Sequence, residues 1–359
     1  MKKIRFGVLS TARIGVKKVI PAMQKGEHTE VVAIASRSLE TGREIAHNLD
    51  IPRWYGSYET LLEDPDLDAI YIPLPNDQHV RWSIRALEAG KHVLCEKPIG
   101  LSAAQGRDLV EAARRHPRLK VMEAMMYRHH LQWRKVKELV ETGQIGNLQA
   151  IQVFFTFYND DPNNIRNNSL KGGGALMDIG CYAISLSRWL FNAEPQRVFG
   201  LLENDPRFGV DRLVSAILDF GVGNATFTCS TQVSPFQRAH VAGTEGHIEL
   251  SQAAFNPPND LPCVIRLLRG GKIEQLKLEA CDQYGNMADR FAEAILRRAP
   301  VPVPLEDAVR NMEVIDAIVA SGCSGSWVRP GTPYLEPDLE REDRTVIQST
   351  RDDLLLNAR

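Results

Sequence analysis

The stretch that decides the fold is Ile4-Arg5-Phe6-Gly7-Val8-Leu9-Ser10-Thr11-Ala12-Arg13-Ile14-Gly15, in which an apolar run ends at a turn of small residues. A strand that turns directly into a helix is where a Rossmann sheet binds the pyrophosphate of a dinucleotide. Against the pattern G-x-G-x-x-G the segment reads Ser10-x-Ala12-x-x-Gly15, and a plain structural turn can look the same. Its place at the start of a strand–helix repeat favours the cofactor, so we expect backbone contacts from Ser10, Thr11, Ala12, Arg13 and Ile14.

Strand and helix patterns alternate over residues 1–124, as they do in a parallel doubly wound sheet. Strand-like runs cover residues 4–9, 30–35, 69–72, 92–94 and 119–122. Helical patterns lie between them over residues 12–24, 39–49, 79–89 and 103–115. Gly90 stands where a helix-ending glycine is expected before the next strand. We therefore predict an N-terminal Rossmann domain over residues 1–124.

The pattern changes after a connecting helix expected over residues 131–141. Strand-like runs then follow, several with alternating polar and apolar residues, over 148–158, 213–220, 225–233, 239–242, 247–250, 264–268 and 272–278. Helices are expected over 174–191, 283–298 and 305–321. The predicted fold is thus α/β: the Rossmann domain, an α+β domain with a large, mostly antiparallel open sheet over 125–326, and a charged, proline-rich tail over 327–359.

Size and charge narrow the classes of protein that the chain can represent. At 359 residues it is too long for one core and fits two domains. A net charge of −2 gives no electrostatic reason to expect nucleic acid or an anionic membrane as a partner. No apolar run approaches the length of a membrane span, and the first one stops at Leu9, which indicates a strand rather than a signal peptide.

Cysteine and histidine spacing argue against disulfides and metal. The cysteines are scattered with no C-x-x-C pair, which is typical of reduced thiols in a cytoplasmic protein: Cys95, Cys181, Cys229, Cys263, Cys281 and Cys323. His129-His130 is the one adjacent histidine pair, and neighbouring positions on a helix point in different directions. We therefore predict no metal site and a cytoplasmic location.

The end of the second strand should read the adenosine ribose of a dinucleotide. An acidic residue there would bind the 2′-hydroxyl of NAD, but this chain has Ser36-Arg37-Ser38. An arginine beside two hydroxyls suits the 2′-phosphate of NADP, because its planar group binds two phosphate oxygens at once. Arg43 can add a second positive charge. An exposed arginine at a strand end is the plainer interpretation; we predict NADP, with NAD as the alternative.

Two further segments point to chemistry. The first runs from Tyr71-Ile72-Pro73-Leu74-Pro75-Asn76-x-x-His79 to the Glu96-Lys97-Pro98 motif. The second is the glycine-rich GGGALMDIGCY at residues 172–182. Together they resemble the glucose–fructose oxidoreductase/inositol dehydrogenase family, in particular its sugar branch with xylose dehydrogenase, 1,5-anhydrofructose reductase and dihydrodiol dehydrogenase. The resemblance extends to about residue 325.

The resemblance implies an NADP-dependent oxidoreductase that moves a hydride between nicotinamide and a sugar, anhydrosugar or related diol or carbonyl. Glu96 and Lys97 stand at the carboxyl edge of the parallel sheet, where such sheets bind ligands. The resemblance places Lys97 against both the nicotinamide ribose and the reacting oxygen. The remaining positions that it assigns to cofactor binding are Pro73, Leu74, Asn76, His79 and Glu96, although His79 can equally cap the following helix.

Asp178 and Tyr182 are four residues apart and share one face of the predicted helix. Gly180 between them costs about 1 kcal/mol relative to alanine, which suggests that substrate or nicotinamide comes close at that turn. The resemblance makes Tyr182 the general acid/base, assisted by Lys97 and Asp178, and we expect the Lys97 ammonium to lower the pKa of Tyr182. The plainer interpretation makes Asp178 an early-helix acid that favours the helix dipole and Tyr182 a core aromatic.

The resemblance also suggests substrate-binding residues and an assembly. Tyr127, Arg128, Arg166 and Tyr284 are predicted to contact substrate, although an arginine in an Asn-rich loop is more often solvated. In the family the open sheet commonly packs against its counterpart, so a homodimer or homotetramer is expected. Two rival functions stay open: an NAD-dependent glycosidase with a tightly held cofactor, and a non-catalytic NADP(H) sensor.

Overall fold

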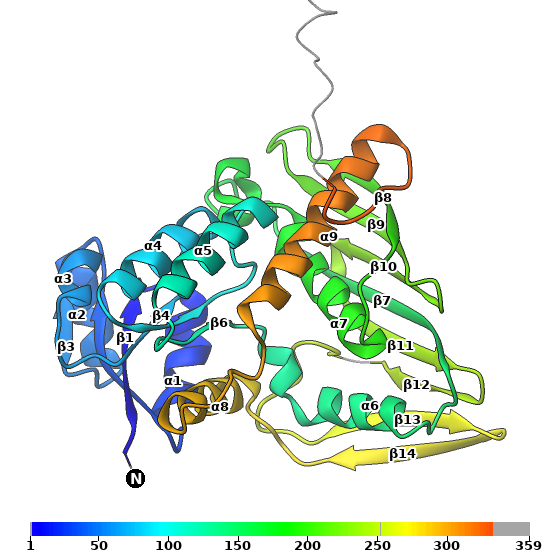
Figure 1. The fold of residues 1–359 in the computed structure, drawn as a ribbon, viewed down its shortest axis with the longest axis horizontal. Helices are drawn as coiled ribbons and strands as arrows, with labels where there is room; N and C mark the ends of the chain where they lie inside the picture. The colour runs from blue at the N-terminus through cyan, green and yellow to red at the C-terminus, as the bar shows by residue number, and fades with distance from the viewer. Residues whose placement is uncertain (1, 252, 333–359) are drawn as a thin grey trace, which may run out of the picture.

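The structure is a computed structural model that describes residues 2–251 and 253–332, and its N-terminal sheet is fully parallel (Figure 1). Its strand order is β3-β2-β1-β4-β5-β6, with β1 (Ile4–Leu9), β2 (Thr29–Ala35), β3 (Arg53–Tyr55), β4 (Ala69–Ile72), β5 (His92–Cys95) and β6 (Val121–Glu123). The strands are almost continuously apolar because helices cover both faces. The chain order reverses between β1 and β4, and their carboxyl ends open the crevice where such sheets bind ligands.

Helices alternate with these strands, as the sequence predicts. They are a π-helix η1 (Gly15–Val19) that continues into α1 (Ile20–Gln24), α2 (Leu39–Asn48), α3 (Tyr58–Leu62), α4 (Asn76–Glu88) and α5 (Ala103–Arg115). Side-chain oxygens of Ser38, Ser57 and Ser102 cap α2, α3 and α5. The sequence analysis missed β3 and α3, which are too short to show a period.

The C-terminal sheet is mixed and mostly antiparallel, in the order β14-β13-β12-β11-β7-β10-β9-β8. Its strands are β7 (Leu148–Tyr158), β8 (Arg197–Asn204), β9 (Asp211–Asp219), β10 (Asn224–Ser230), β11 (Gln232–Gly243), β12 (Gly246–Leu250), β13 (Cys263–Arg269) and β14 (Lys272–Leu278). One pair, β7 with β10, is parallel. The predicted fold class is confirmed.

Two details of this sheet differ from the prediction. The run expected over 225–233 is two strands, because the chain leaves β10 at Ser230 and starts β11 at Gln232. The strand β8 was not predicted, since Gly200 interrupts its apolar pattern and Leu201 points outward with 70% of its side chain exposed.

Helices cover one face of this sheet, which we call the inner face (Figure 1). They are α6 (Leu131–Glu141), the π-helix η5 (Leu176–Gly180), its continuation α7 (Cys181–Phe191) and α9 (Leu305–Ser324). Stacked rings of Phe155 and Phe255, 5.4 Å apart, lie in the core between sheet and helices. The opposite, outer face carries the alternate side chains of the same strands, many of them exposed.

The chain crosses back to the N-terminal sheet after β14. Helix α8 (Gln283–Leu296) packs on β1, β2 and α1, with Phe291 and Phe6 in contact at 6.3 Å between ring centroids. The Asp289 carboxylate accepts hydrogen bonds from the backbone N–H groups of Glu27 and His28. This return joins the two sheets, so the crevice at the β1 and β4 edge faces the helices of the second sheet.

The first residues of the predicted tail are attached to the second sheet. Val328 forms a backbone bridge with Val198 of β8, and the Trp327 ring lies 4.7 Å from the Arg197 guanidinium. The remainder of that tail, 333–359, lies outside the described residues.

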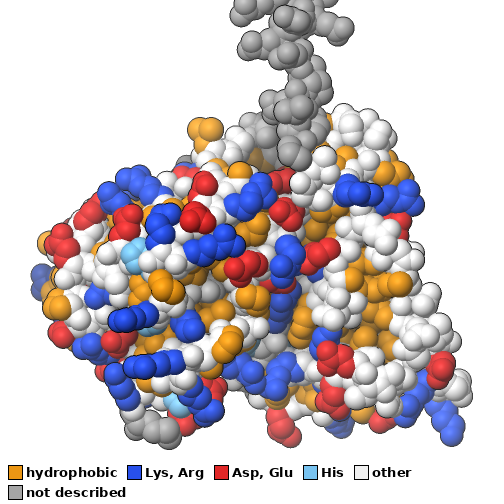
Figure 2. Space-filling model, viewed as in Figure 1, with side chains coloured by type: hydrophobic (Ala, Val, Ile, Leu, Met, Phe, Trp, Pro, Cys, Tyr) orange, Lys and Arg blue, Asp and Glu red, His pale blue; other side chains and the backbone are white. Residues whose placement is uncertain are grey.

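The six cysteines are free thiols, of which Cys323 is exposed. Among the described helices, none is both long enough and apolar enough to cross a membrane. Figure 2 shows basic, acidic and hydrophobic side chains interspersed over one face of the molecule, in keeping with the net charge of −2.

Candidate active site

The turn after β1 is built around Ser10. This residue has a φ of 104°, in a region that side chains other than glycine rarely adopt. Its hydroxyl donates to the Pro73 carbonyl at 3.1 Å and accepts from the Ala12 N–H at 3.2 Å, which offsets the strain. Serine therefore occupies the conformation of the first glycine of the dinucleotide pattern and ties the β1 turn to the β4 turn.

The helix after this turn is open to an anion. Its first helical residue is Arg13, and the first N–H groups of a helix have no partner within the helix, so they suit phosphate oxygens. Gly15 leaves room beside β4, since a Cβ there would already touch Pro73 at 3.4 Å. Thr11 is half-buried, and Arg13 and Ile14 are exposed at the turn. The residues present thus fit a dinucleotide pyrophosphate.

The end of β2 presents hydroxyls and exposed arginines. Ser36 is buried and its hydroxyl accepts from the Ser38 N–H at 3.3 Å, while Ser38 in turn caps α2. Arg37 and Arg43 are exposed beside this turn. An exposed guanidinium next to a helix N-terminus is chemically suited to a phosphate group.

The PN-x-x-H segment fastens three loops together. The buried His79 ring places Nδ1 at 2.8 Å from the Pro98 carbonyl and Nε2 at 2.7 Å from the Leu74 carbonyl, and burial lowers its pKa. Asn76 Nδ2 donates to the Gly172 carbonyl at 2.8 Å. His79 therefore holds the β4 and β5 turns, which include the buried Pro73, and Asn76 attaches the glycine-rich segment to them.

Lys97, Asp178 and Arg166 meet at this edge. Lys97 Nζ donates to the Asp178 backbone carbonyl at 2.5 Å and lies 3.2 Å from Asp178 Oδ1. The other carboxylate oxygen, Oδ2, accepts from Arg166 Nε at 2.6 Å. The Lys97–Pro98 peptide bond is cis. Residues from three distant parts of the sequence thus form one cluster with two positive charges and one negative charge.

The charges in this cluster reinforce one another. Burial alone would raise the pKa of Asp178, but the charges of Arg166 and Lys97 outweigh it and hold that pKa well below its usual range. Burial likewise disfavours charged Lys97, yet the Asp178 carboxylate raises its pKa. All three groups are therefore ionised at neutral pH.

Tyr182 lies beside Lys97 but not as expected. The Lys97 ammonium is 4.9 Å from the centroid of the Tyr182 ring, over its face, and the Tyr182 hydroxyl donates to Met126 Sδ at 3.4 Å. Burial raises the pKa of Tyr182 well above its ordinary value. The expected lowering of this pKa by Lys97 is wrong, because a cation over the ring does not stabilise charge on the phenolate oxygen as one beside that oxygen would.

Glu96 is held within the same crevice. Its Oε1 accepts from the Tyr71 hydroxyl at 2.7 Å, and burial raises the pKa of the carboxyl. Helix α8 brings the buried Tyr284 into this neighbourhood; burial raises the pKa of Tyr284 first, and Glu96 raises it further. The structure therefore groups Glu96, Tyr71 and Tyr284, of which the sequence analysis did not name Tyr71 as a site residue.

Tyr127 and Arg128 lie behind Tyr182. The buried Tyr127 hydroxyl donates to Ser185 Oγ at 2.9 Å, and its ring meets the Tyr182 ring edge-on at 5.9 Å. Arg128 Nη2 pairs with Asp307 Oδ2 at 3.1 Å and also donates to Ser185 Oγ. Tyr127 thus packs against the Tyr182 ring, and Arg128 is held against α7 through Ser185. That these two side chains contact substrate stays a prediction.

The three glycines before η5 admit groups that a side chain would exclude. A Cβ on Gly172 would stand 3.1 Å from Asn76 Cβ, and one on Gly173 would stand 2.4 Å from the Arg166 carbonyl. Gly174, with φ of 108°, would place a Cβ 2.1 Å from the Asp211 carboxylate. The sequence analysis did not name Asp211, because a carboxylate at the start of a distant strand gives no local signal.

Asp211 holds the start of the segment that carries Asp178 and Tyr182. Its Oδ2 accepts from the Leu176 N–H at 2.6 Å, at the N-terminus of η5. Burial raises the pKa of Asp211 to about 7. This cap fixes where the helix begins, and therefore where its side chains point.

The role proposed for Gly180 is corrected by its surroundings. A Cβ there would stand 2.9 Å from Leu176 Cδ1 and 3.2 Å from the Cys229 sulfur on β10. The close approach that requires glycine is thus between helix and inner face, and not between helix and ligand.

Asp211 gives a prediction about pH. The folded protein holds the Asp211 proton more tightly than the unfolded chain, whose carboxyl has a pKa of about 4. This stabilisation is present below about pH 4 and is lost as the pH rises toward 7. Asp211→Asn retains an acceptor oxygen, so we expect the thermal midpoint to fall less between pH 4.5 and 8 than in the parent protein.

The control is Asp282→Asn, the same change at the side-chain cap of α8. Melting curves of the three proteins at several pH values give the comparison. Parallel pH profiles for the parent protein and Asp211→Asn would contradict the raised pKa.

Comparisons with known proteins agree with this geometry. Residues 4–124 match the oxidoreductase family with an NAD-binding Rossmann fold, and residues 133–249 match the GFO/IDH/MocA C-terminal domain. An oxidoreductase of Rhizobium meliloti is 45% identical over 333 residues, which are 91% of this chain and 99% of the relative. D-xylose 1-dehydrogenase (NADP(+)) 2 of Haloferax volcanii is 37% identical over 325 residues, 90% of this chain and 98% of the relative.

A solved structure shows the same arrangement of elements. It is a 3-ketoreductase from Actinomadura kijaniata in complex with NADP and TDP-benzene, with a TM-score of 0.83 and 31% identity over 89% of this chain and 98% of that chain. The motifs, the two sheets and these matches lead to one conclusion: the chain belongs to the GFO/IDH/MocA family of oxidoreductases.

Proposed function

We propose that this protein is an NADP-dependent oxidoreductase that transfers a hydride between nicotinamide and a sugar, anhydrosugar or related diol or carbonyl. The observation that carries the proposal is the cluster of Lys97, Asp178 and Tyr182 at the carboxyl edge of the N-terminal sheet. In that place a bound dinucleotide extends toward groups that can hold and move a proton. The relatives include a xylose dehydrogenase and a 3-ketoreductase, whose substrates share a reacting carbon that bears oxygen.

The proposed cofactor sites follow the edge of the sheet. The β1 turn from Ser10 to Ile14 would hold the pyrophosphate, and Ser36, Arg37, Ser38 and Arg43 would hold the adenosine 2′-phosphate. Pro73, Leu74, Asn76, His79, Glu96 and Lys97 would line the nicotinamide end. The NADP in the related 3-ketoreductase and in the name of the xylose dehydrogenase supports NADP over NAD. When bound, the nicotinamide supplies or accepts the hydride.

The chain's own residues would supply the proton chemistry. Because burial keeps the Tyr182 hydroxyl protonated, it is ready to give a proton to the oxygen of a carbonyl under reduction. In the oxidising direction, the tyrosinate form of Tyr182 would accept the hydroxyl proton, with the positive charge of Lys97 close to its ring. Asp178 keeps Lys97 charged and in place. The guanidinium of Arg166, 39% exposed, adds hydrogen-bond donors for substrate hydroxyls.

These features also bear on the rival functions. A sensor that only binds NADP(H) has no use for a buried lysine, carboxylate and tyrosine at the reacting end of the crevice. A glycosidase that oxidises its sugar transiently would use the same residues, but it would retain the cofactor and show no net turnover of it.

We propose further that the protein is cytoplasmic, because its thiols are free and five of them are buried. We also propose domain boundaries at 124/125 and 326/327.

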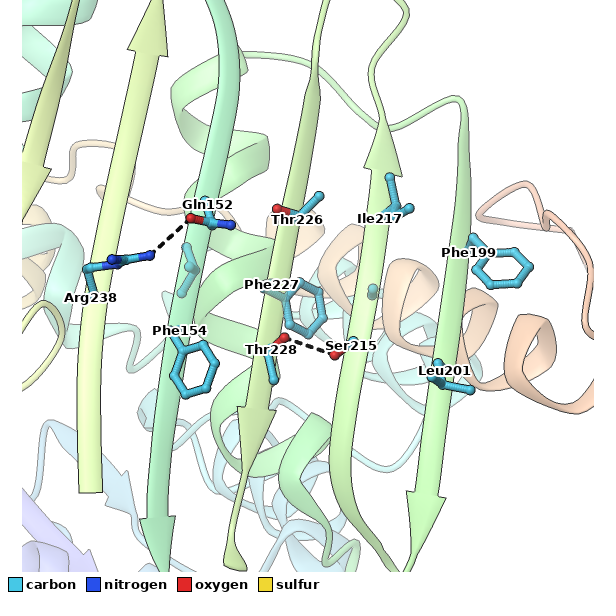
Figure 3. Close-up of a pocket in the computed structure, with 12 residues that line it drawn as sticks. Gln152, Phe154, Phe199, Leu201, Ser215, Ile217, Thr226, Phe227, Thr228 and Arg238 are labelled. Atoms are coloured by element: carbon cyan, nitrogen blue, oxygen red, sulfur yellow. Dashed lines mark hydrogen bonds between the residues drawn. The ribbon is translucent and has the colours of Figure 1, made fainter. Parts of the chain in front are cut away.

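The outer face of the C-terminal sheet supports a homo-oligomer. A hollow of about 380 Å³ crosses it, lined by side chains such as Phe154, Leu201, Ile217 and Thr226 (Figure 3). Leu201, Ile217 and Phe236 leave 70%, 39% and 47% of their side chains exposed. A broad sheet face with exposed apolar groups is self-complementary about a two-fold axis, so we propose that a second copy of this chain covers it.

Substrate oxidation with NADP and carbonyl reduction with NADPH test the proposed function. A panel of aldoses, ketoses, anhydrosugars and trans-dihydrodiols is followed by the absorbance of the reduced nicotinamide. We expect turnover of at least one member, and a kcat lower by about 10² in Tyr182→Phe, the usual scale for losing a general acid/base. Tyr158→Phe is the matched control, because that tyrosine is exposed at the end of β7.

Absence of turnover across the panel, with cofactor that stays bound during purification, would instead support the glycosidase. Near-parental kcat in Tyr182→Phe would remove that hydroxyl from the mechanism.

Arg37→Asp should shift preference from NADP toward NAD, because it replaces a phosphate-binding cation with a carboxylate that repels phosphate and accepts from a ribose hydroxyl. The ratio of kcat/KM for the two cofactors measures the shift. Arg118→Asp, at an exposed turn between α5 and β6, is the control. An unchanged ratio in Arg37→Asp would count against the 2′-phosphate role.

Ile217→Asp should separate the proposed dimer, because it buries a charge in an apolar interface. Sedimentation velocity measures the mass of the variant and of Leu170→Asp, a control at a side chain that is 83% exposed on another part of the surface. A monomeric parent protein, or an Ile217→Asp variant as large as the parent, would reject this interface.

A further inference from the structure

Three metal-ligating side chains gather on the outer face, away from the candidate active site. They are His240 on β11 and His247 and Glu249 on β12, and their ligand atoms all lie within 4.8 Å of one another. The sequence does not identify these three residues as a cluster, because His240 lies on a different strand from His247 and Glu249. Antiparallel pairing places His240 directly opposite Glu249.

The pleat of the sheet puts all three on one side. His247 and Glu249 are two residues apart on β12 and so point to the same face, while Ile248 between them is fully buried on the inner face. His240 is flanked by the buried Ala239 and Val241, so it too points outward. Two ligands at alternate positions of one strand and a third across the ladder form a triangle that can supply three of the four ligands of a tetrahedral metal ion.

The histidines are available as ligands. Nε2 of His240 is buried and has no hydrogen-bond partner among the described residues, a state that costs free energy until a partner is found. The two imidazole rings stand at 84° to each other, with centroids 4.8 Å apart.

Only small adjustments separate this arrangement from a coordinated one. Ligand atoms at about 2.0–2.1 Å from a tetrahedral zinc are roughly 3.3 Å from each other. Each pair therefore has to close by about 1.5 Å at most, which rotation about the imidazole χ2 bonds can provide because that torsion is broad.

Glu249 has one oxygen free for a metal. Its Oε2 accepts from Arg266 Nη1 at 2.7 Å, which orients the carboxylate and leaves Oε1 without that contact. An outer partner of this kind is common for metal-binding carboxylates. Two imidazole nitrogens and one carboxylate are a poor ligand set for Mg²⁺ or Ca²⁺, which take oxygen ligands. A cation that favours imidazole nitrogen is therefore preferred.

We propose that His240, His247 and Glu249 form a site for Zn²⁺ that fastens β11 to β12 on the outer face. The site is separate from the redox chemistry, since Tyr182 packs on Phe155 of the inner face. The inference does not depend on the proposed function.

Zinc binding to the metal-stripped full chain tests this proposal by isothermal titration with zinc chloride at pH 7.5. Cys323→Ser serves as the background, because it removes the exposed thiol that also binds zinc. We expect one zinc equivalent that is lost in His240→Ala and in His247→Ala and weakened at least about tenfold in Glu249→Gln. His116→Ala, at the half-buried end of α5, should leave it intact.

Thermal melting supplies the second measurement. Saturating zinc should raise the thermal midpoint of the background protein and not that of the His240→Ala/His247→Ala double variant. Without zinc, the two midpoints show whether the double variant is folded. Zinc binding and stabilisation that persist in the folded double variant would overturn the proposal, as would the absence of a zinc equivalent in the background protein.

Discussion

The Asp178 carboxylate, shared between Lys97 and Arg166, is the constraint on which the rest of this structure depends. A charge buried to this degree is tolerated only with partners, and the loss of one partner leaves an uncompensated ion. The partners come from the carboxyl edge of the first sheet and from the loop that follows β7. The pairing of Asp178 with Lys97 and Arg166 therefore requires one fixed arrangement of the two sheets.

Other contacts at the junction serve this arrangement. Asn76 holds the glycine-rich segment to the cofactor edge, and Asp211 caps the helix that carries Asp178 and Tyr182. Glycine is required before the helix because a Cβ on Gly172 would collide with Asn76 and a Cβ on Gly174 would collide with Asp211. The segment is thus placed by hydrogen bonds from both domains.

The sequence was informative where function follows from local geometry. Carboxyl ends of parallel strands share an edge, so Ser10, Arg37 and Lys97 could be placed along one edge of the sheet. A spacing of four residues indicated that Asp178 and Tyr182 lie close together, and both lie near Lys97. It failed where contacts are long-range. The neighbour of Gly180 is a strand about fifty residues away, and the pKa of Tyr182 depends on which part of its ring Lys97 faces. Asp211 and the histidines of the outer face required strand register that no local pattern supplies.

Side chains alternate between the two faces of a β-strand, so each strand of the second sheet presents different residues to the inner and the outer face. On β7, Phe155 points inward and packs against Tyr182, while Phe154 and Gln152 point outward into the hollow of the outer face (Figure 3). Adjacent residues of one strand thus have different surroundings: Phe155 packs against Tyr182, and Phe154 lines the hollow on the outer face. Because inner and outer side chains alternate along each strand, residues of the outer face can be substituted without altering the packing around Tyr182. Backbone hydrogen bonds between the strands hold the inner residues in place, and substitutions of outer side chains leave these hydrogen bonds intact.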